Sequence, residues 1–239
     1  MTEALKRQNV TRGLVPRRLK RPAGLGETVY EHILAELMSL RIAPSSRINI
    51  DTLAREMGVS QTPIREALSR LEEQGLVVKT HNVGYSAAPQ IDAVRFNELY
   101  DLRLLLEPEA AARTAARISD AEIKALADLT RRMNGSGAND ARGSYSRFAM
   151  LDAEFHDRIL KLCGNSLIYE ALSRLHIHLH LFRLHFHAKV TSCAIREHEA
   201  LGAAFVERDS EKARRAMKRH IELSRERFMV TFADLGPNM

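Results

Sequence analysis

Hydrophobic residues recur at helical spacing along most of the chain. Over residues 27–40 they stand three or four positions apart, which predicts an amphipathic helix. Two shorter helices are expected next, one capped at Asp51 and one over 61–74. Gly58 suits the end of the former, and Ser60 suits the start of the latter. The pattern therefore predicts a first helix followed by two short helices joined by a tight turn.

The pattern changes after the third helix. Residues 76–80 and 84–87 predict two short strands around a polar turn, and Pro89 closes this unit. From residue 91 onward the period is helical again. Six helices are expected there, near 91–117, 119–134, 143–163, 166–187, 191–208 and 210–233. Their short connections predict a helical bundle with one core.

These patterns divide the chain into three parts and give a mainly α fold class. A basic arm over residues 1–26 is expected to be disordered, a helical unit with a hairpin spans 27–90, and an all-helical domain spans 91–235. The arm carries seven Lys and Arg against a single Glu. Such a segment is either an inert solvated tail or an arm that touches phosphate groups.

Composition narrows the class of protein. The chain is 45% hydrophobic and 28% charged, as is usual for a globular protein, and its net charge of +6 permits nucleic-acid binding. Its two cysteines match no zinc spacing and no secreted disulfide framework. No apolar run is long enough to span a membrane, and no secretory signal is present. We therefore expect a cytoplasmic protein without a membrane partner.

The two short helices have the spacing of a helix-turn-helix. In such a unit the first turn of the second helix enters the major groove, where its outward residues would be Gln61, Thr62, Arg65 and Ser69. Arginine can form two hydrogen bonds with guanine, and glutamine can pair with adenine. The alternative for Arg65 is a surface ion pair with an acidic neighbour. A following hairpin favours DNA binding, since a wing supplies a second backbone contact.

The predicted DNA-binding unit is not basic as a whole. Residues 27–90 hold six Lys and Arg against eight Asp and Glu. Binding would then depend on local placement, on the avidity of a dimer and on the basic arm. For Arg70 we expect a surface ion pair with one of three acidic residues of its own helix: Glu66, Glu72 or Glu73.

Residues 53–68 read LAREMGVSQTPIREAL, which resembles the signature of the GntR family of bacterial repressors. The resemblance implies a winged helix-turn-helix and a homodimer on a pseudo-palindromic operator, with half-sites about one helical turn apart. The usual form has Arg at the position of Gln61, so the base preference there is expected to differ. The resemblance implies DNA contacts from Ser60, Thr62, Arg65 and the wing residue Gly84.

Ten histidines occur, most of them after residue 150. Helical phase places Asp152 and His156 on one face at the edge of a core stripe, and it places His198 and His220 within the apolar stripes of their helices. A buried imidazole needs a polar partner. These four residues could meet around a divalent cation such as Zn, Ni, Fe or Mn. Alternatively, each histidine is hydrogen-bonded separately in the core.

The region from Phe96 to Phe228 resembles the FCD ligand-binding domain that follows the winged helix in one branch of GntR regulators. Four motifs carry the resemblance: DLRLLLEPEA at 101–110, DAEFH at 152–156, EHEAL at 197–201 and MKRH at 217–220. The resemblance implies a metal site whose four ligands are Asp152, His156, His198 and His220. It also implies an effector, commonly a carboxylate, that faces Arg103. An internal ion pair with Glu107 is the other interpretation of Arg103.

The predicted helix over 166–187 is rich in histidine, with His176, His178, His180, His185 and His187. A spacing of two places neighbours about 200° apart around a helix, so these side chains cannot all converge on one ion. We expect them to line a pocket or to be solvated, and one or two could touch an effector.

The sequence thus predicts a DNA-binding repressor controlled by a small-molecule effector that binds near the metal. Two alternatives remain open: a regulator that responds to the metal alone, and a metal-dependent hydrolase. A hydrolase needs a general base, and the nearby candidate Glu154 points away from Asp152 by helical phase. We therefore expect no enzymatic activity.

Overall fold

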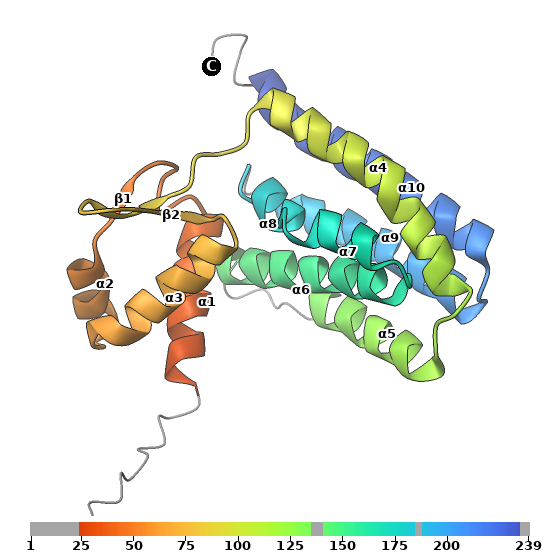
Figure 1. Cartoon of the computed structure of the whole chain (residues 1–239), viewed down its shortest axis with the longest axis horizontal. Helices are drawn as coiled ribbons and strands as arrows, with labels where there is room; N and C mark the ends of the chain where they lie inside the picture. The colour runs from red at the N-terminus through yellow and green to blue at the C-terminus, as the bar shows by residue number, and fades with distance from the viewer. Residues whose placement is uncertain (1–23, 135–140, 185–187, 235–239) are drawn as a thin grey trace, which may run out of the picture.

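The computed structural model describes residues 24–134, 141–184 and 188–234 (Figure 1). Most of the predicted basic arm, residues 1–23, lies outside the described residues, as do His185 and His187. The first helix begins at Leu25, two positions before the predicted start.

The N-terminal unit contains three helices and a small sheet. The helices are α1 (Leu25–Met38), α2 (Ile50–Met57) and α3 (Gln61–Glu73), and the strands are β1 (Arg47–Ile48), β2 (Val77–Thr80) and β3 (Gly84–Ala87). The sheet is antiparallel in the order β1-β3-β2. The hairpin is where the sequence predicts it. The strand β1 was not predicted, because two residues are too few to show alternation.

Local capping explains the helix-turn-helix. The side chain of Asn49 accepts a hydrogen bond from the backbone N–H of Thr52 at 3.0 Å, so Asn49 caps α2. The predicted cap at Asp51 is therefore wrong by two positions. Gly58 ends α2 in the left-handed region at φ 65°, as predicted. Ser60 occupies the cap position of α3 with extended backbone, but its side chain makes no capping hydrogen bond.

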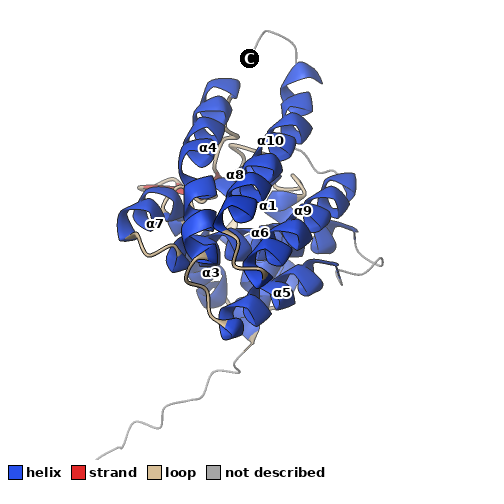
Figure 2. Cartoon of the chain, turned by 90° about the vertical axis from the view of Figure 1, so that its right-hand side faces the viewer, coloured by secondary structure: helices blue, strands red, loops and turns tan. Residues whose placement is uncertain are grey.

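The C-terminal bundle places α4 and α10 side by side at one edge, with α6 running through the middle (Figures 1 and 2). Its helices are α4 (Ala93–Ala115), α5 (Asp120–Asn134), α6 (Ala141–Leu162), α7 (Ser166–Ser173), α8 (Ile177–Phe182), α9 (Ala188–Val206) and α10 (Ser210–Asp234). In the described parts of the chain, no helix is both long enough and apolar enough to cross a bilayer.

The prediction of one continuous helix over 166–187 is wrong. The chain breaks at His176, whose φ of 42° and ψ of 39° lie in the left-handed region, and α8 starts anew at Ile177. The apolar spacing continues across the break, since Leu172 and Leu179 are both buried. Periodicity alone therefore gave no sign of it.

The short helix α8 ties the bundle to the segment that leaves the wing. Arg183, at the end of α8, is buried and donates from Nη2 to the carbonyl of Ala88 at 2.8 Å. In return, Gln90 donates from Nε2 to the carbonyl of Arg183 at 2.6 Å. One end of α8 is thus fixed to the connection between β3 and α4.

Candidate metal centre and nucleic-acid interface

Three histidines from three helices meet in the core of the bundle. They are His156 on α6, His198 on α9 and His220 on α10, and each is at most 3% exposed. One ligand atom from each lies within 4.8 Å of those of the other two. The structure thus buries and brings together the three histidines that the sequence singled out.

Two of these rings are held by carboxylates, one buried and one partly buried. His156 Nδ1 lies 2.8 Å from Glu107 Oε2, and His220 Nδ1 lies 2.8 Å from Glu197 Oε2. Glu107 also accepts a hydrogen bond from Arg103 Nε at 2.6 Å. A histidine that binds a metal typically donates its second N–H to a carboxylate in this way, which fixes the tautomer and leaves the other nitrogen free.

Three of the four remaining ring nitrogens have no hydrogen-bond partner among the described residues. Among the described residues, Nε2 of His156 and both nitrogens of His198 are buried without a hydrogen bond. Asp152 Oδ1 lies 3.2 Å from His198 Nε2, yet the ring is not aligned to donate a hydrogen bond to it. A buried polar atom without a partner is costly, so these nitrogens are where a ligand is expected.

A fourth histidine, His178, belongs to the same cluster. Its Nδ1 lies 2.7 Å from Asp152 Oδ2, and its ring stacks on His156 with 4.1 Å between centroids. Together with Glu107 and His156 it forms a second group of closely spaced ligand atoms. This role of His178 was not predicted, because the sequence shows it only as one of five histidines on an expected continuous helix.

Burial sets the protonation of the cluster. It lowers the pKa of His156 to about 4, with the charge of His178 adding to the effect, and lowers the pKa of His220 to about 3. Burial alone would raise the pKa values of Asp152 and Glu107. The charge and hydrogen bond of His178 outweigh it for Asp152, and Arg103 and His156 outweigh it for Glu107, so both pKa values stay well below normal. Neutral imidazoles beside ionised carboxylates are the state that binds a cation.

Arg103 takes part in the ion pair that the sequence offered as one of two interpretations. Its Nε donates to Glu107, while its Nη2 is buried without a hydrogen-bond partner in the described structure. Arg103 lines a small cavity of about 10 Å³, together with Asp152, His178 and His220. That volume is about what one water molecule requires. An organic carboxylate could enter only if neighbouring side chains moved.

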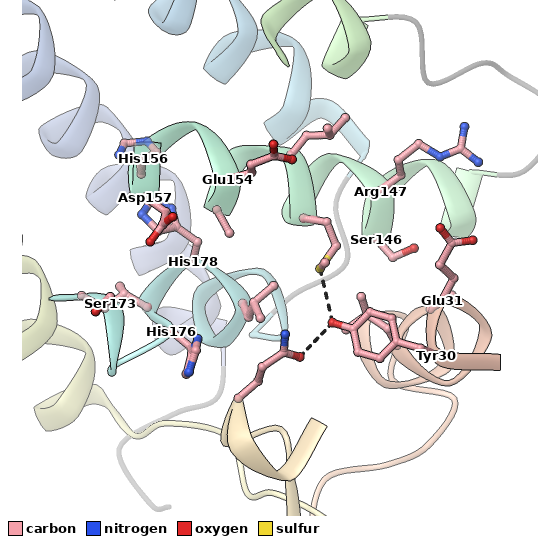
Figure 3. A pocket seen from close by; sticks show the side chains of 18 of the residues that line it. Tyr30, Glu31, Ser146, Arg147, Glu154, His156, Asp157, Ser173, His176 and His178 are labelled. Carbon is pink, nitrogen blue, oxygen red and sulfur yellow. Dashed lines mark hydrogen bonds between the residues drawn. The ribbon is translucent and has the colours of Figure 1, made fainter. Parts of the chain in front are cut away.

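A larger groove of about 910 Å³ lies between α1 and the α6–α8 wall (Figure 3). His156 and His178 stand at one end of it, and Tyr30 stands at the other. The Tyr30 hydroxyl donates to Gln74 Oε1 at 2.9 Å, directly after α3. Glu154 is exposed and lines this groove, whereas Asp152 is buried, which agrees with the opposite directions that helical phase predicted for these two residues.

The predicted DNA-reading residues are exposed at the start of α3. Arg65 Nη2 donates to Gln61 Oε1 at 3.2 Å, and Gln61 in turn donates to Asp51. Ser60 and Thr62 are exposed beside them. The wing residue Gly84 is exposed with φ 111°, a conformation that favours glycine.

A groove of about 380 Å³ separates α3 from the wing. Arg47, Arg65 and Lys79 line it, which gives it basic character even though the unit as a whole is acidic. Arg47 and Lys79 were not predicted, because only the fold brings the β1 strand and the wing beside α3. Arg70 forms an ion pair as expected, but with Glu27 of α1 at 2.8 Å and not with its own helix.

Family models match both halves of the chain. The model described as bacterial regulatory proteins of the gntR family matches residues 25–86, and the FCD domain model matches residues 98–223. The first match covers the winged unit, and the second covers all three clustered histidines.

The relatives are regulators. The chain is 37% identical over 128 residues to the Nta operon transcriptional regulator of Aminobacter aminovorans, a match spanning 54% of this chain and 59% of that protein. It is 28% identical over 195 residues to an HTH-type transcriptional regulator of Streptomyces ambofaciens, spanning 81% of this chain and 80% of that protein. It is 22% identical over 201 residues to the repressor RspR of Escherichia coli K12, spanning 83% of this chain and 86% of that protein.

Solved structures support the same fold. Escherichia coli McbR/YncC superposes with a TM-score of 0.62 at 18% identity, covering 88% of this chain and 98% of that one. The GntR regulator from Rhodococcus sp. RHA1 gives a TM-score of 0.55 at 19% identity, covering 86% and 97%. The family and its relatives are transcriptional regulators and not enzymes, so the hydrolase hypothesis is dropped. The chain belongs to the GntR family of bacterial regulatory proteins, in the branch with an FCD domain, and is a DNA-binding transcriptional regulator.

Proposed function

We propose that this regulator is a repressor whose affinity for operator DNA is set by a divalent cation in the FCD bundle and by a carboxylate effector near it. It acts in the cytoplasm as a homodimer on a pseudo-palindromic operator. Ser60, Gln61, Thr62, Arg65 and Gly84 contact the DNA. The proposal rests on one observation above all: buried histidines from three helices bring their ligand atoms within 4.8 Å of one another, and the ring nitrogens of His156 and His198 there include three without a hydrogen-bond partner in the described structure.

The donor set fits a divalent transition metal. Asp152, His156, His198 and His220 offer one carboxylate and three imidazoles, which suits Zn, Ni, Fe or Mn. Glu107 and Glu197 hold two of the rings by Nδ1, so the opposite nitrogens remain available. A bound cation would supply positive charge that joins α6, α9 and α10 at one point. Its binding energy would then stabilise one arrangement of these helices.

Arg103 is the residue that would receive the effector's carboxylate, through the Nη2 group that lacks a partner. The small cavity beside it favours a second candidate function, in which the cation alone is the signal. In that case Arg103 serves only to balance Glu107. The two functions differ in whether a carboxylate changes DNA affinity once the metal is bound.

The helix α8 offers a route from this centre to the DNA-binding unit. His178 contacts Asp152. Two residues further along α8, His180 lies against Gly75, just after the end of α3. A methyl group on Gly75 would stand 3.1 Å from His180 Nε2. Arg183 then holds the carbonyl of Ala88. If a metal or an effector shifts α8, the contacts of α8 with Gly75 and Ala88 next to the recognition helix change. A coupling free energy of a few kcal/mol between effector binding and DNA binding suffices for regulation.

The test is a titration of operator DNA with the full-length protein by fluorescence anisotropy. Chelated protein, protein with one equivalent of zinc, and zinc-loaded protein with small carboxylates are compared. We expect zinc to change the dissociation constant, and a carboxylate to change it again. A change with zinc alone supports the metal-responsive function, and identical curves in all three states contradict control through this centre.

The DNA-binding surface is tested separately. Arg65→Ala should weaken operator binding and relax base preference, by about 1–3 kcal/mol if the arginine reads a guanine. Arg113→Ala is the matched control, because Arg113 is an exposed arginine paired with Glu109 in the bundle. Equal affinities for Arg65→Ala and Arg113→Ala would show that α3 is not the reading helix.

A further inference from the structure

A second set of possible metal ligands faces the groove between α1 and the α6–α8 wall (Figure 3). Glu107, His156 and His178 each offer one ligand atom, and these atoms lie within 4.8 Å of one another. All three residues line the groove, whereas His198 and His220 do not. The rest of the groove wall carries acidic, basic and apolar side chains. His156 thus belongs to two groups: an outer group with Glu107 and His178 at the groove, and the inner group of three histidines in the core.

The surroundings of His178 are those of a metal-binding histidine. Its Nδ1 lies 2.7 Å from Asp152 Oδ2. His156 and His220 show the same arrangement, each with a carboxylate oxygen 2.8 Å from Nδ1. A carboxylate on one ring nitrogen orients the ring and leaves the other nitrogen for the metal. Nε2 of His178 is therefore a candidate ligand atom.

His178 is also the most accessible member of the outer group. Its side chain is 13% exposed, against 1% for His156 and 3% for Glu107. Its ring lies directly against that of His156, with 4.1 Å between the centroids. Glu107 accepts a hydrogen bond from Arg103 and holds His156, yet a carboxylate offers about four lone-pair sites, so it can still bind a cation. A cation that arrives through the groove therefore meets His178 before the two buried ligands.

We infer that Glu107, His156 and His178 form an outer cation position, where a divalent metal binds on its way between the groove and the inner group. The inference rests on the proposed metal centre, because an entry position needs a destination. Two imidazoles and one carboxylate suit the same transition metals as the inner group. Since His156 belongs to both groups, a cation that moves from one to the other can keep a protein ligand throughout.

The first experiment measures how fast zinc enters and leaves the full-length protein, by stopped flow against a chelating dye. His178→Asn keeps a donor for Asp152 near the place of Nδ1 but removes Nε2. A residue on the path changes both rates by the same factor and leaves the dissociation constant unchanged. We expect both rates to fall about tenfold, the lower end of the effect of one residue near a metal. His176→Asn is the matched control, since this histidine lines the same groove, belongs to neither group and has a left-handed backbone that asparagine tolerates.

The second experiment isolates the outer position. His198→Gln with His220→Gln removes two ligands of the inner group, and Cu²⁺ is added to this full-length double variant and followed by electron paramagnetic resonance. We expect one bound Cu²⁺ with imidazole nitrogen ligands, and a further His178→Asn change should weaken its binding at least about tenfold.

The outcomes separate the outer position from the inner centre. Unchanged or faster zinc entry in His178→Asn would overturn the inference, because His178 would then lie off the path or block it. A double variant that keeps its circular dichroism spectrum but binds no Cu²⁺ would overturn it too, while zinc binding by the wild-type protein leaves the inner centre intact. A wild-type protein that binds no zinc contradicts both.

Discussion

The ion pair between Arg103 and Glu107 gives a direct test of how the centre is built. Both side chains are nearly inaccessible, at 1% and 3% exposed, and Glu107 also holds His156. Glu107→Gln keeps the shape and one carbonyl oxygen but removes the charge. Arg103 then remains buried without its ion-pair partner, and the oxygen of the new amide can serve only part of the original network.

The expected loss follows from that burial. Removing one member of a buried ion pair costs about 3–5 kcal/mol, because the remaining charge is left uncompensated. The retained amide oxygen places Glu107→Gln near the lower end, at about 3 kcal/mol. The control is Glu109→Gln, two positions along the same helix, where Glu109 pairs with Arg113 and Arg214 in partly exposed positions. Surface pairs of this kind contribute about 0–1 kcal/mol each.

The assay is urea unfolding of the chelated protein, followed by far-ultraviolet circular dichroism. A loss of about 3 kcal/mol should lower the urea midpoint by roughly 1–3 M at the usual dependence on denaturant. A double variant, Arg103→Met with Glu107→Leu, removes both charges and should regain part of the loss, although His156 still lacks its partner. If Glu107→Gln costs no more than Glu109→Gln, the buried pair does not organise the centre as argued.

Three further predictions address the same structure. Burial lowers the pKa values of His156 and His220 to about 4 and about 3, so these groups take up protons in the unfolded chain before they do in the folded one as the pH falls. The stability of the metal-free protein should therefore not depend on these groups above about pH 6.5, and it should fall from there toward pH 4 by about 1.4 kcal/mol per pH unit for each. Unfolding curves recorded at several pH values measure this. Glu197→Gln should weaken zinc binding about 10–100-fold in competition with a chelating dye, whereas Glu207→Gln, at an exposed position just after α9, should not. Gly75→Ala should lower stability by about 1–2 kcal/mol because of the left-handed φ of 70°, and by a further amount because the new methyl group meets His180. Adding His180→Ala should restore only the loss caused by the contact with His180. If it restores nothing, that contact is unimportant.

Much of the fold could be predicted from local signals. Gly58 separates α2 from α3 because a left-handed residue ends a helix, and that requirement is visible in the sequence. The burial of His156, His198 and His220 followed from helical phase, since each falls on or beside an apolar stripe. These features depend on neighbours in the sequence or on one helix alone.

The missing parts depend on contacts between elements. Glu197 and Glu107 hold rings on other helices, so no spacing within one helix identifies them as partners of His220 and His156. The break at His176 is set by packing, because the apolar period runs through it unchanged. His178 reaches Asp152 only because α8 restarts after that break.

The position of α8 connects these observations. A helix of six residues is too short to be stable alone, so contacts on its two sides must hold it in place. On one side His178 meets Asp152 of the proposed metal centre, and on the other His180 and Arg183 meet the DNA-binding unit and its connection. His178 contacts Oδ2 of Asp152, while Oδ1 lies 3.2 Å from His198. A cation that took Asp152 as a ligand would turn this carboxylate, and loss of the 2.7 Å contact with His178 would remove one of the few restraints on α8 and alter the contact of His180 with Gly75 behind α3.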